Sequence, residues 1–320
     1  MKFKPILIVA GEPNSVFFEI FFKSLKKLKI KSPIILIASE KLLRLEMQKF
    51  NFNKKIKLLD EKNLQYKKLD NKFLNLININ YKNLNKISLS SNKYIYDCFE
   101  TAFNVIKQYN LNKFINGPVN KNKFLEKKFF GITEYISHKF KIKEHAMLIY
   151  NQGLSVCPVT THLPLKKVAK KINKKLIIEK TMLIDDFYKK KIKKKPRIAI
   201  LGLNPHCESV DRFNEDEYII KPAISILKKK RYYVSGPYPA DTIFLKQNRF
   251  KYDVILGMYH DQVLTPLKTL FEYDAINITL GLPFTRISPD HGPNERMRDK
   301  NISNPLSLIK AISFLDKNWL

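Results

Sequence analysis

The chain has 320 residues, which exceeds one typical domain and allows a large core, so two lobes or one large α/β domain are expected rather than a minimal module. Its formal net charge of +30 raises the question of a nucleic-acid or anionic-membrane partner. The lysines are spread along the whole chain and mixed with Asn and Ile, which favours a general compositional bias over a binding patch.

The three cysteines lie far apart with no CxxC pair, so neither a disulfide framework nor a thiolate zinc site is predicted. No apolar stretch approaches the roughly 20 residues needed to span a bilayer, and the run near Met1 is too short for a signal peptide. We therefore expect a cytoplasmic protein with no membrane partner.

Apolar, β-branched runs alternate with amphipathic stretches along the chain. Continuous apolar strands that alternate with helices predict an α/β fold with a mainly parallel sheet covered on both faces. The predicted strands span residues 5–10, 32–39, 113–119, 154–161, 197–203, 252–259 and 275–282. The predicted helices span residues 17–28, 96–109, 217–230 and 304–319. The Lys/Asn-rich segment 51–92 predicts no definite element.

Three of the predicted strands lead to a histidine: residues 154–161 to His162, 197–203 to His206, and 252–259 to His260. In open α/β sheets ligands bind beyond the carboxyl ends of the strands, so neighbouring strands would bring these imidazoles together. Three neutral nitrogens with open coordination positions suit a catalytic Zn²⁺, Co²⁺ or Mn²⁺. A single histidine at a strand end is ordinarily a hydrogen-bonded loop residue, and that alternative stays open.

Downstream of His260 lie Lys268, Asn277 and Arg286. Two fixed positive charges and an amide near such a site would hold a phosphate or carboxylate, although each alone is an ordinary surface residue type. No GxGxxG follows the first predicted strand and no GxxxxGK[ST] occurs, so neither a Rossmann fingerprint nor a P-loop is predicted.

A series of short motifs runs in order along nearly the whole chain. The motifs are GEPNS (11–15), NGPVNK (116–121), GITEYIS (131–137), TTHLPL (160–165), GLNPH (202–206), GPYPADT (236–242), MYHDQ (258–262), NITLGLPFTR (277–286) and DHG (290–292). In this order they resemble the signature segments of the PdxA family, the 4-hydroxythreonine-4-phosphate dehydrogenases of vitamin B6 biosynthesis.

The resemblance implies a two-lobed α/β/α subunit related to isocitrate and isopropylmalate dehydrogenases. One discontinuous lobe on the dinucleotide side would span residues 1–122 and 257–320. The other lobe, on the metal, substrate and dimer side, would span residues 123–256, with the active site in the cleft between the lobes. The resemblance also implies a homodimer in which the partner subunit completes the active site.

The resemblance further implies particular site residues. His162, His206 and His260 would hold a divalent metal (Zn, Co, Mn or Mg), and Asp241 and Asp261 would support the metal or handle protons beside Lys268. Thr133, Lys268, Asn277 and Arg286 would contact a phosphorylated substrate. Asp290, His291 and Gly292 would lie at the cofactor, which is NAD, with NADP as an alternative.

The implied reaction is NAD-linked oxidation of 4-phosphooxy-L-threonine to a β-keto acid, which loses CO₂ to give 3-amino-2-oxopropyl phosphate. Metal and nicotinamide are suited to an alcohol oxidation of this kind. The reaction places the chain in pyridoxal 5′-phosphate biosynthesis.

Three departures from the family pattern affect this interpretation. Ile132 replaces the histidine of the family's Gly-His-Thr-Glu, residues 207–217 replace a glycine-rich acidic segment, and residues 293–305 replace segments that shape the dinucleotide pocket. Arg296 and Arg298 in the last of these could favour the extra phosphate of NADP. Because of Ile132, the same fold and metal acting on another phosphorylated or carboxylated hydroxy acid stays open as an alternative. A basic nucleic-acid-binding protein, suggested by the net charge of +30, is a second and less favoured alternative.

Overall fold

The structure is a computed structural model, which describes residues 3–81, 89–120, 124, 125, 129, 131–289 and 292–317. The chain divides into two compact units. Unit 1 comprises Met1–Phe129 and Pro283–Leu320, and unit 2 comprises Phe130–Leu282. Residues 257–282, for which the family resemblance implies the first lobe, fall in unit 2, where their strand pairs with residues 146–150.

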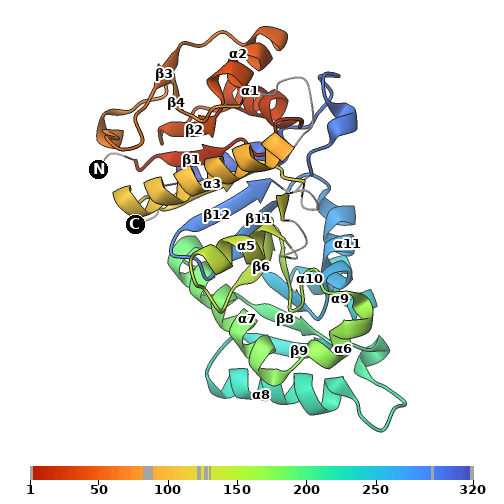
Figure 1. Cartoon of the computed structure of the whole chain (residues 1–320). Coiled ribbons are helices and arrows are strands. Elements are labelled where there is room, and N and C mark those ends of the chain that lie inside the picture. Colours follow the sequence, from red (N-terminus) through yellow and green to blue (C-terminus); the bar gives the residue numbers. More distant parts are fainter. Residues whose placement is uncertain are drawn as a thin grey trace. The chain divides into compact units, whose positions relative to one another are not determined.

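Unit 1 contains a parallel sheet with the strand order β3–β4–β2–β1–β5–β12 (Figure 1). The strands are β1 (Ile6–Val9), β2 (Ile34–Ala38), β3 (Ile56–Leu58), β4 (Leu74–Asn78), β5 (Lys113–Asn116) and β12 (Thr285–Pro289). Every residue of β1, β2 and β5 is buried, and successive strand residues point to opposite faces, so the sheet is covered on both faces there.

The helices of unit 1 are α1 (Phe17–Lys27), α2 (Glu40–Lys49), α3 (Leu89–Tyr109) and α12 (Leu306–Asp316). Helix α3 packs against β1 and β2, and α12 packs against α1 and against β1, β5 and β12. Four phenylalanines of α1 are buried, which explains the dense apolar sequence of that helix.

Unit 2 contains a mixed sheet with the order β11–β6–β7–β10–β8–β9. The strands are β6 (Ala146–Tyr150), β7 (Ser155–Pro158), β8 (Ile198–Leu201), β9 (Val234–Tyr238), β10 (Val254–Gly257) and β11 (Ile276–Leu280). The pairs β7–β10, β10–β8 and β8–β9 are parallel, whereas β11–β6 and β6–β7 are antiparallel.

The helices of unit 2 include α5 (Ile132–Lys139), α6 (Val168–Lys171), α7 (Lys174–Phe187), α8 (Lys221–Lys229), α9 (Ala240–Ile243), α10 (Lys246–Arg249) and α11 (His260–Phe271). Helix α8 packs against α7 and β9 (Figure 1). Helix α11 follows β10 directly and packs against β7 and β10, so the first residue of α11 lies at the carboxyl end of β10.

The α/β fold class with a mostly parallel sheet is confirmed, and each of the seven predicted strands corresponds to a strand of the structure. The four predicted helices are also present, with α3 beginning earlier than predicted, at Leu89, and the helix at 217–230 beginning as a π-helical turn at Asp216. The segment 51–92 contains β3, β4 and the start of α3. No helix among the described residues is long and apolar enough to cross a membrane.

Asp253 fixes the beginning of β10, the strand that leads to His260. Its carboxylate lies 2.6 Å from Lys194 Nζ and accepts hydrogen bonds from the Arg197 backbone N–H at 2.9 Å and from Arg197 Nε at 3.2 Å. Burial alone would raise the pKa of Asp253, but the hydrogen bonds and charges of Arg197 and Lys194 outweigh it and lower the pKa. This carboxylate therefore joins the starts of β8 and β10.

We expect Asp253→Asn to lower the free energy of unfolding by about 1 kcal/mol at neutral pH, since these charge-assisted contacts are partly exposed. The folded-state pKa lies below the unfolded value, so the contribution is complete above the unfolded pKa and is lost as the pH falls through the folded pKa. Urea unfolding of both proteins between neutral and acidic pH measures the difference. The control is Asp186→Asn, which removes an exposed helical pair with Lys190. A stability difference that stays constant with pH would contradict this explanation.

Candidate functional site

The three histidines follow three adjacent parallel strands in unit 2. Strand β10 lies between β7 and β8 and pairs with both in parallel, which confirms that the strands leading to the histidines are neighbours. The β7–β10 pairing continues beyond the strands, because the Thr160 backbone N–H and Oγ1 both donate to the Met258 carbonyl, at 3.2 and 2.8 Å. His162 and His260 each lie two residues beyond this contact, at matching positions.

The imidazoles of His162 and His260 lie close together. Their ring centroids are 5.7 Å apart and the ring planes are inclined by 37°. His260 is the first residue of α11, and its Nδ1 lies 2.7 Å from Asp261 Oδ1. Because Asp261 occupies the Nδ1 side of the ring, Nε2 is the nitrogen of His260 left for a ligand.

Gln262 connects the ends of β10 and β8. Its Oε1 accepts a hydrogen bond from the Met258 backbone N–H at 2.7 Å, and its Nε2 donates to the Gly202 carbonyl at 2.8 Å. Three consecutive residues thus have three different roles: His260 supplies an imidazole, Asp261 contacts that imidazole, and Gln262 fixes the loop.

Glu134 is a site residue that the sequence analysis did not identify. It lies in the first turn of α5, its Oε1 is 3.7 Å from His162 Nδ1, and Thr161 Oγ1 donates to the same oxygen at 3.0 Å. Burial alone would raise the pKa of Glu134, but the contacts with His162 and Thr161 outweigh it and lower the pKa to about 2. The carboxylate is therefore ionised at neutral pH. The feature of the sequence that could have identified Glu134 as a site residue is its position in the GITEYIS motif.

Gly131 fits against this pair because it has no side chain. A Cβ at this position would lie 2.8 Å from Glu134 Oε2 and 3.0 Å from His162 Cε1. Both atoms would have to shift to admit any larger residue. The glycine before α5 therefore allows Glu134 and His162 to approach each other.

His206 lies at the carboxyl end of β8 in a left-handed conformation, with φ 56°. The buried carboxylate of Asp216 holds the preceding turn, accepting from the backbone N–H of Leu203 at 2.8 Å and of Asn204 at 3.1 Å. The side chain of Asn204 also donates to Asp216, at 3.0 Å. Asp216 thus keeps the backbone before His206 in one conformation.

The structure brings His162 and His260 together without assembling the complete triad in one chain. Among the described residues, no group of three or more His, Cys, Asp or Glu side chains is placed to hold a metal ion. The triad that includes His206 therefore stays a prediction.

Several predicted substrate residues lie in unit 2. Thr133 on α5 is buried, and its Oγ1 is 3.4 Å from Thr279 Oγ1 on β11. Asn277 lies two residues before Thr279 and so faces the same side of the sheet, and its Oδ1 is buried without a hydrogen-bond partner in the described part of the chain. Lys268 lies on α11, and Asp241 is exposed in α9 beyond β9.

The remaining predicted residues belong to unit 1. Arg286 on β12 is 2% exposed, and its Nε donates to Asn116 Oδ1 on β5 at 2.7 Å. Gly292 is exposed. Asp290 and His291 lie outside the described residues, so their predicted cofactor role has no structural description.

The loops after β1 and β5 approach each other closely. Gly11 has φ 82°, and a Cβ there would lie 2.4 Å from the Pro118 carbonyl oxygen. Because β2 and β5 flank β1 on opposite sides, the strand order reverses at this position, and the crevice beyond such a switch point is the usual ligand site of an open α/β sheet.

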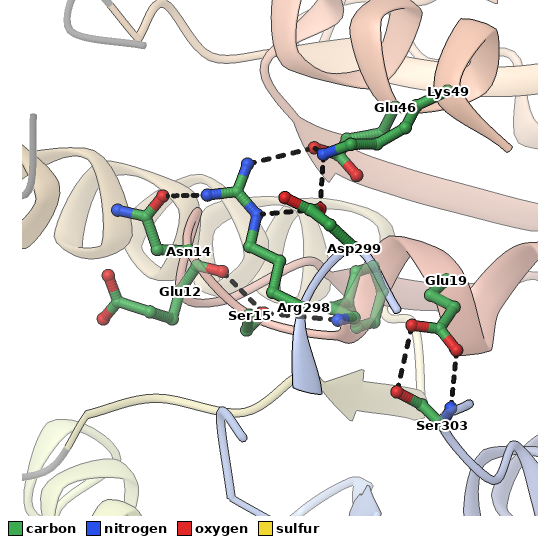
Figure 2. A network of polar contacts seen from close by, with 10 residues as sticks. Glu12, Asn14, Ser15, Glu19, Glu46, Lys49, Arg298, Asp299 and Ser303 are labelled. Carbon is green, nitrogen blue, oxygen red and sulfur yellow. Dashed lines mark hydrogen bonds and ion pairs between the residues drawn. The ribbon is translucent and has the colours of Figure 1, made fainter. Parts of the chain in front are cut away.

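A polar network holds the segment 293–304 against the loop after β1 and against α1 and α2 (Figure 2). Arg298 donates to Asn14 Oδ1 at 2.6 Å and to Glu46 Oε1 at 3.2 Å. The Glu19 carboxylate accepts from the Ser303 backbone N–H at 2.6 Å and from its hydroxyl at 3.0 Å. Arg298 is therefore already paired within unit 1.

Comparison with solved structures assigns the fold class. The chain matches the crystal structure of a 4-hydroxythreonine-4-phosphate dehydrogenase from Klebsiella pneumoniae with a TM-score of 0.81 at 26% identity, covering 98% of each chain. An isocitrate dehydrogenase from Methylococcus capsulatus shares the fold, with a TM-score of 0.50 at 10% identity, over 98% of this chain and 84% of that chain. The protein is thus an α/β oxidoreductase with an isocitrate dehydrogenase-like fold.

Sequence comparison then identifies the family. The profile of the family described as "Pyridoxal phosphate biosynthetic protein PdxA" matches residues 29–315, and the chain belongs to this family. It is 36% identical to a 4-hydroxythreonine-4-phosphate dehydrogenase of Sulfurihydrogenibium sp. (strain YO3AOP1), over 96% of each chain. It is also 34% identical to a D-threonate 4-phosphate dehydrogenase of Salmonella typhimurium, over 65% of this chain and 64% of the relative.

We expect Arg298→Ala to lower the free energy of unfolding by about 2 kcal/mol, because it removes two hydrogen bonds and leaves the buried Glu46 carboxylate with fewer partners. Amide exchange in residues 293–304 should accelerate by about tenfold or more. Urea unfolding and hydrogen exchange measure the two effects. The control is Arg296→Ala, an exposed arginine two residues earlier, for which a change within about 0.5 kcal/mol is expected. Unchanged protection of 293–304 in Arg298→Ala would contradict the role of the network.

Proposed function

We propose that this protein oxidises the secondary hydroxyl of 4-phosphooxy-L-threonine with NAD⁺ and a divalent metal. The carbon that bears this hydroxyl transfers its hydrogen as a hydride to NAD⁺ and the hydroxyl loses its proton to the protein, which gives a β-keto acid. The keto acid loses CO₂ and takes up a proton to give 3-amino-2-oxopropyl phosphate. The reaction belongs to vitamin B6 biosynthesis.

The observation that best supports the proposal is the pair of imidazoles of His162 and His260, which lie side by side at the ends of adjacent parallel strands. Each Nδ1 has a carboxylate nearby, Glu134 for His162 and Asp261 for His260. In proteins, imidazoles that bind metals usually donate their second ring N–H to a carboxylate or carbonyl.

The predicted metals are Zn²⁺, Co²⁺, Mn²⁺ and Mg²⁺, and a donor set of imidazole nitrogens with carboxylates beside them fits the transition metals among these better than Mg²⁺. We infer that His162, His206 and His260 hold the metal. When bound, such a metal supplies Lewis-acid polarisation of the substrate oxygen, as in other metal-assisted alcohol oxidations.

The chain's own residues would bind and orient the substrate. The buried Oδ1 of Asn277 can accept a hydrogen bond from the substrate, and the hydroxyl of Thr133 lies on the same side of β11. Lys268 and Arg286 supply the positive charges that a phosphate or carboxylate requires. The guanidinium of Arg286 is oriented by its hydrogen bond to Asn116.

Proton transfer in this proposal is assigned to Asp241, Asp261 and Lys268. Asp261 is held against His260 Nδ1 and its side chain is 80% exposed, so it can stabilise the ring and exchange a proton with water. Asp241 is exposed beyond β9, the strand next to β8. Lys268 is the third candidate for moving a proton during oxidation or decarboxylation.

The cofactor proposal is NAD, with NADP as the alternative, and the nicotinamide supplies the hydride acceptor. Asp290, His291 and Gly292 are proposed to contact it. Because Arg298 is paired with Glu46, Arg296 is the arginine of this segment that remains available for an extra phosphate. Arg296 is exposed and forms no hydrogen bond or ion pair with the residues described in the structure.

The proposal includes a cytoplasmic homodimer in which both subunits contribute to each active site, as the family resemblance implies. A nucleic-acid partner is not part of it. The excess of basic residues is explained instead by the lysines spread over the whole sequence.

A second candidate substrate is another phosphorylated or carboxylated hydroxy acid. Ile132 replaces the family's histidine and is 7% exposed at the start of α5, next to Thr133. An apolar side chain there cannot donate a hydrogen bond, and losing one to a charged group costs about 1.5 to 3 kcal/mol. The relative that acts on D-threonate 4-phosphate makes that compound the first alternative to test.

We expect the purified protein to form NADH from NAD⁺ and 4-phosphooxy-L-threonine only when Zn²⁺, Co²⁺, Mn²⁺ or Mg²⁺ is present, and chelator to abolish the activity. His260→Ala should lower kcat/KM about 100-fold or more while the protein stays folded, because it removes a metal ligand. NADH absorbance and circular dichroism measure the two properties. His138→Ala, an exposed histidine on α5, is the control and should retain activity.

D-Threonate 4-phosphate is assayed in parallel under the same conditions. Turnover of that compound alone would replace the leading substrate with the second candidate. Metal-independent turnover, or full activity of His260→Ala, would contradict the metal role of the histidine pair.

We expect Arg296→Ala to raise KM for NADP⁺ by about tenfold and to leave KM for NAD⁺ within about twofold, because one exposed charge contact is lost only with the extra phosphate. Initial rates with each dinucleotide, and quenching of protein fluorescence by each, measure the change. An equal rise in both KM values would show that Arg296 contacts a part of the cofactor common to NAD and NADP.

A further inference from the structure

Each of the two paired imidazoles of unit 2 has a carboxylate on its Nδ1 side, within hydrogen-bond distance at His260 and at ion-pair distance at His162. Asp261 Oδ1 lies 2.7 Å from Nδ1 of His260, and Glu134 Oε1 lies 3.7 Å from Nδ1 of His162. In both rings the nitrogen turned toward a carboxylate is Nδ1, so Nε2 is the nitrogen left for coordination. The two carboxylates belong to different helices: Asp261 follows His260 directly on α11, whereas Glu134 lies on α5.

The position of Glu134 is fixed by contacts on several sides. Thr161, the residue before His162, donates its hydroxyl to Oε1 of Glu134 at 3.0 Å. Gly131 leaves room for the carboxylate and the His162 ring, since a Cβ would meet Oε2 at 2.8 Å and ring atom Nδ1 at 3.1 Å. Glu134 also lies in the first turn of α5, where the helix dipole favours a negative charge.

We propose that Glu134 is a positioning residue, whose carboxylate orients the His162 ring for metal binding in the way that Asp261 orients His260. The inference rests on the proposed function, because it requires His162 to be a metal ligand. A carboxylate on the second nitrogen fixes the tautomer and orientation of a ligating imidazole and makes its free nitrogen a stronger donor.

This role would also connect metal binding to substrate binding. Thr133, a proposed substrate contact, precedes Glu134 on α5, and its hydroxyl lies 3.4 Å from that of Thr279 on β11. A single helical turn thus carries one residue directed toward β11 and one directed toward His162. A shift of α5 would disturb both contacts together.

The test measures metal affinity without substrate or NAD. The full chain is freed of metal with a chelator and titrated with Co²⁺, whose visible absorption reports ligand geometry, and with Zn²⁺ in competition with a chromogenic chelator. We expect Glu134→Gln to weaken Co²⁺ and Zn²⁺ binding about 10- to 100-fold and to change the Co²⁺ spectrum. Glu144→Gln, an exposed glutamate of the same unit, is the matched control and should bind within about twofold of the unchanged protein.

Thermal unfolding of the metal-free proteins shows whether Glu134→Gln changes the stability of the fold, independently of its effect on metal affinity. Equal metal affinity in Glu134→Gln and the unchanged protein would overturn the role of Glu134, even if the variant were less stable. If Glu134→Gln does not fold, Thr161→Val replaces it, since it removes the hydroxyl that holds Glu134, and a loss of affinity of about threefold or more is expected. Affinity unchanged in Thr161→Val would then overturn the role.

The same titration distinguishes this inference from the proposed function. If the unchanged protein binds neither Co²⁺ nor Zn²⁺, the metal site of the proposed function fails, and the role of Glu134 fails with it. If the unchanged protein binds metal and Glu134→Gln binds it equally well, only the role of Glu134 is overturned.

Discussion

The parallel pairing of β10 with β7 and β8 is the constraint on which the candidate site depends. Side chains after these strands meet because parallel strands end at the same edge of a sheet. The contact between Thr160 and Met258 extends this order by one step beyond the strands, and Gln262 joins the ends of β10 and β8. The positions of His162 and His260 therefore follow from the strand pairing and from the side-chain hydrogen bonds of Thr160 and Gln262.

The position of His206 depends on a loop with an unfavourable backbone conformation, in addition to the strand that precedes it. His206 and Cys207 both have positive φ, which is unfavourable for residues with a Cβ. The fully buried Asp216 compensates by accepting hydrogen bonds from two successive backbone N–H groups and from the side chain of Asn204. This network lies in the segment that departs from the family's glycine-rich pattern, so a different sequence here supports the turn that carries the histidine.

The sequence predicted the parts of the fold that depend on local patterns. Buried parallel strands have continuous apolar runs, so β1, β2, β7, β8 and β10 could be located from these runs in the sequence. Strands β3 and β4 were not predicted because they lie in a Lys/Asn-rich segment. Strand β6 is antiparallel to both of its neighbours, and a sequence pattern does not indicate strand direction. The division of the chain also depends on long-range pairing, because β10 and β11 join unit 2 through β7 and β6.

The sequence could predict those site residues that come directly after predicted strands. His162 and His260 were placed correctly next to each other by that rule, whereas Glu134 reaches His162 across 28 residues of sequence, which no spacing rule predicts. For Arg298, in contrast, the sequence suggested a binding role that its contacts in the structure do not favour. Its sequence context suggested an arginine for a cofactor phosphate, yet the structure pairs it with Glu46 and Asn14. The residue type and its charge indicate what a side chain can bind, but the neighbouring residues in the fold determine what it does bind.

Several buried carboxylates have more hydrogen-bond partners than the exposed lysines of this chain. With 59 basic and 29 acidic residues, lysines at exposed positions contribute little individually, and surface substitutions of this kind usually change stability by less than about 0.5 kcal/mol. The carboxylates of Glu19, Glu46, Glu134 and Asp216 are instead held by several partners each, where removal would leave backbone or side-chain donors unpaired. Lysines at exposed positions can thus be numerous while Glu134 and Asp216 hold the loops beside the histidines and Glu19 and Glu46 hold the segment 293–304.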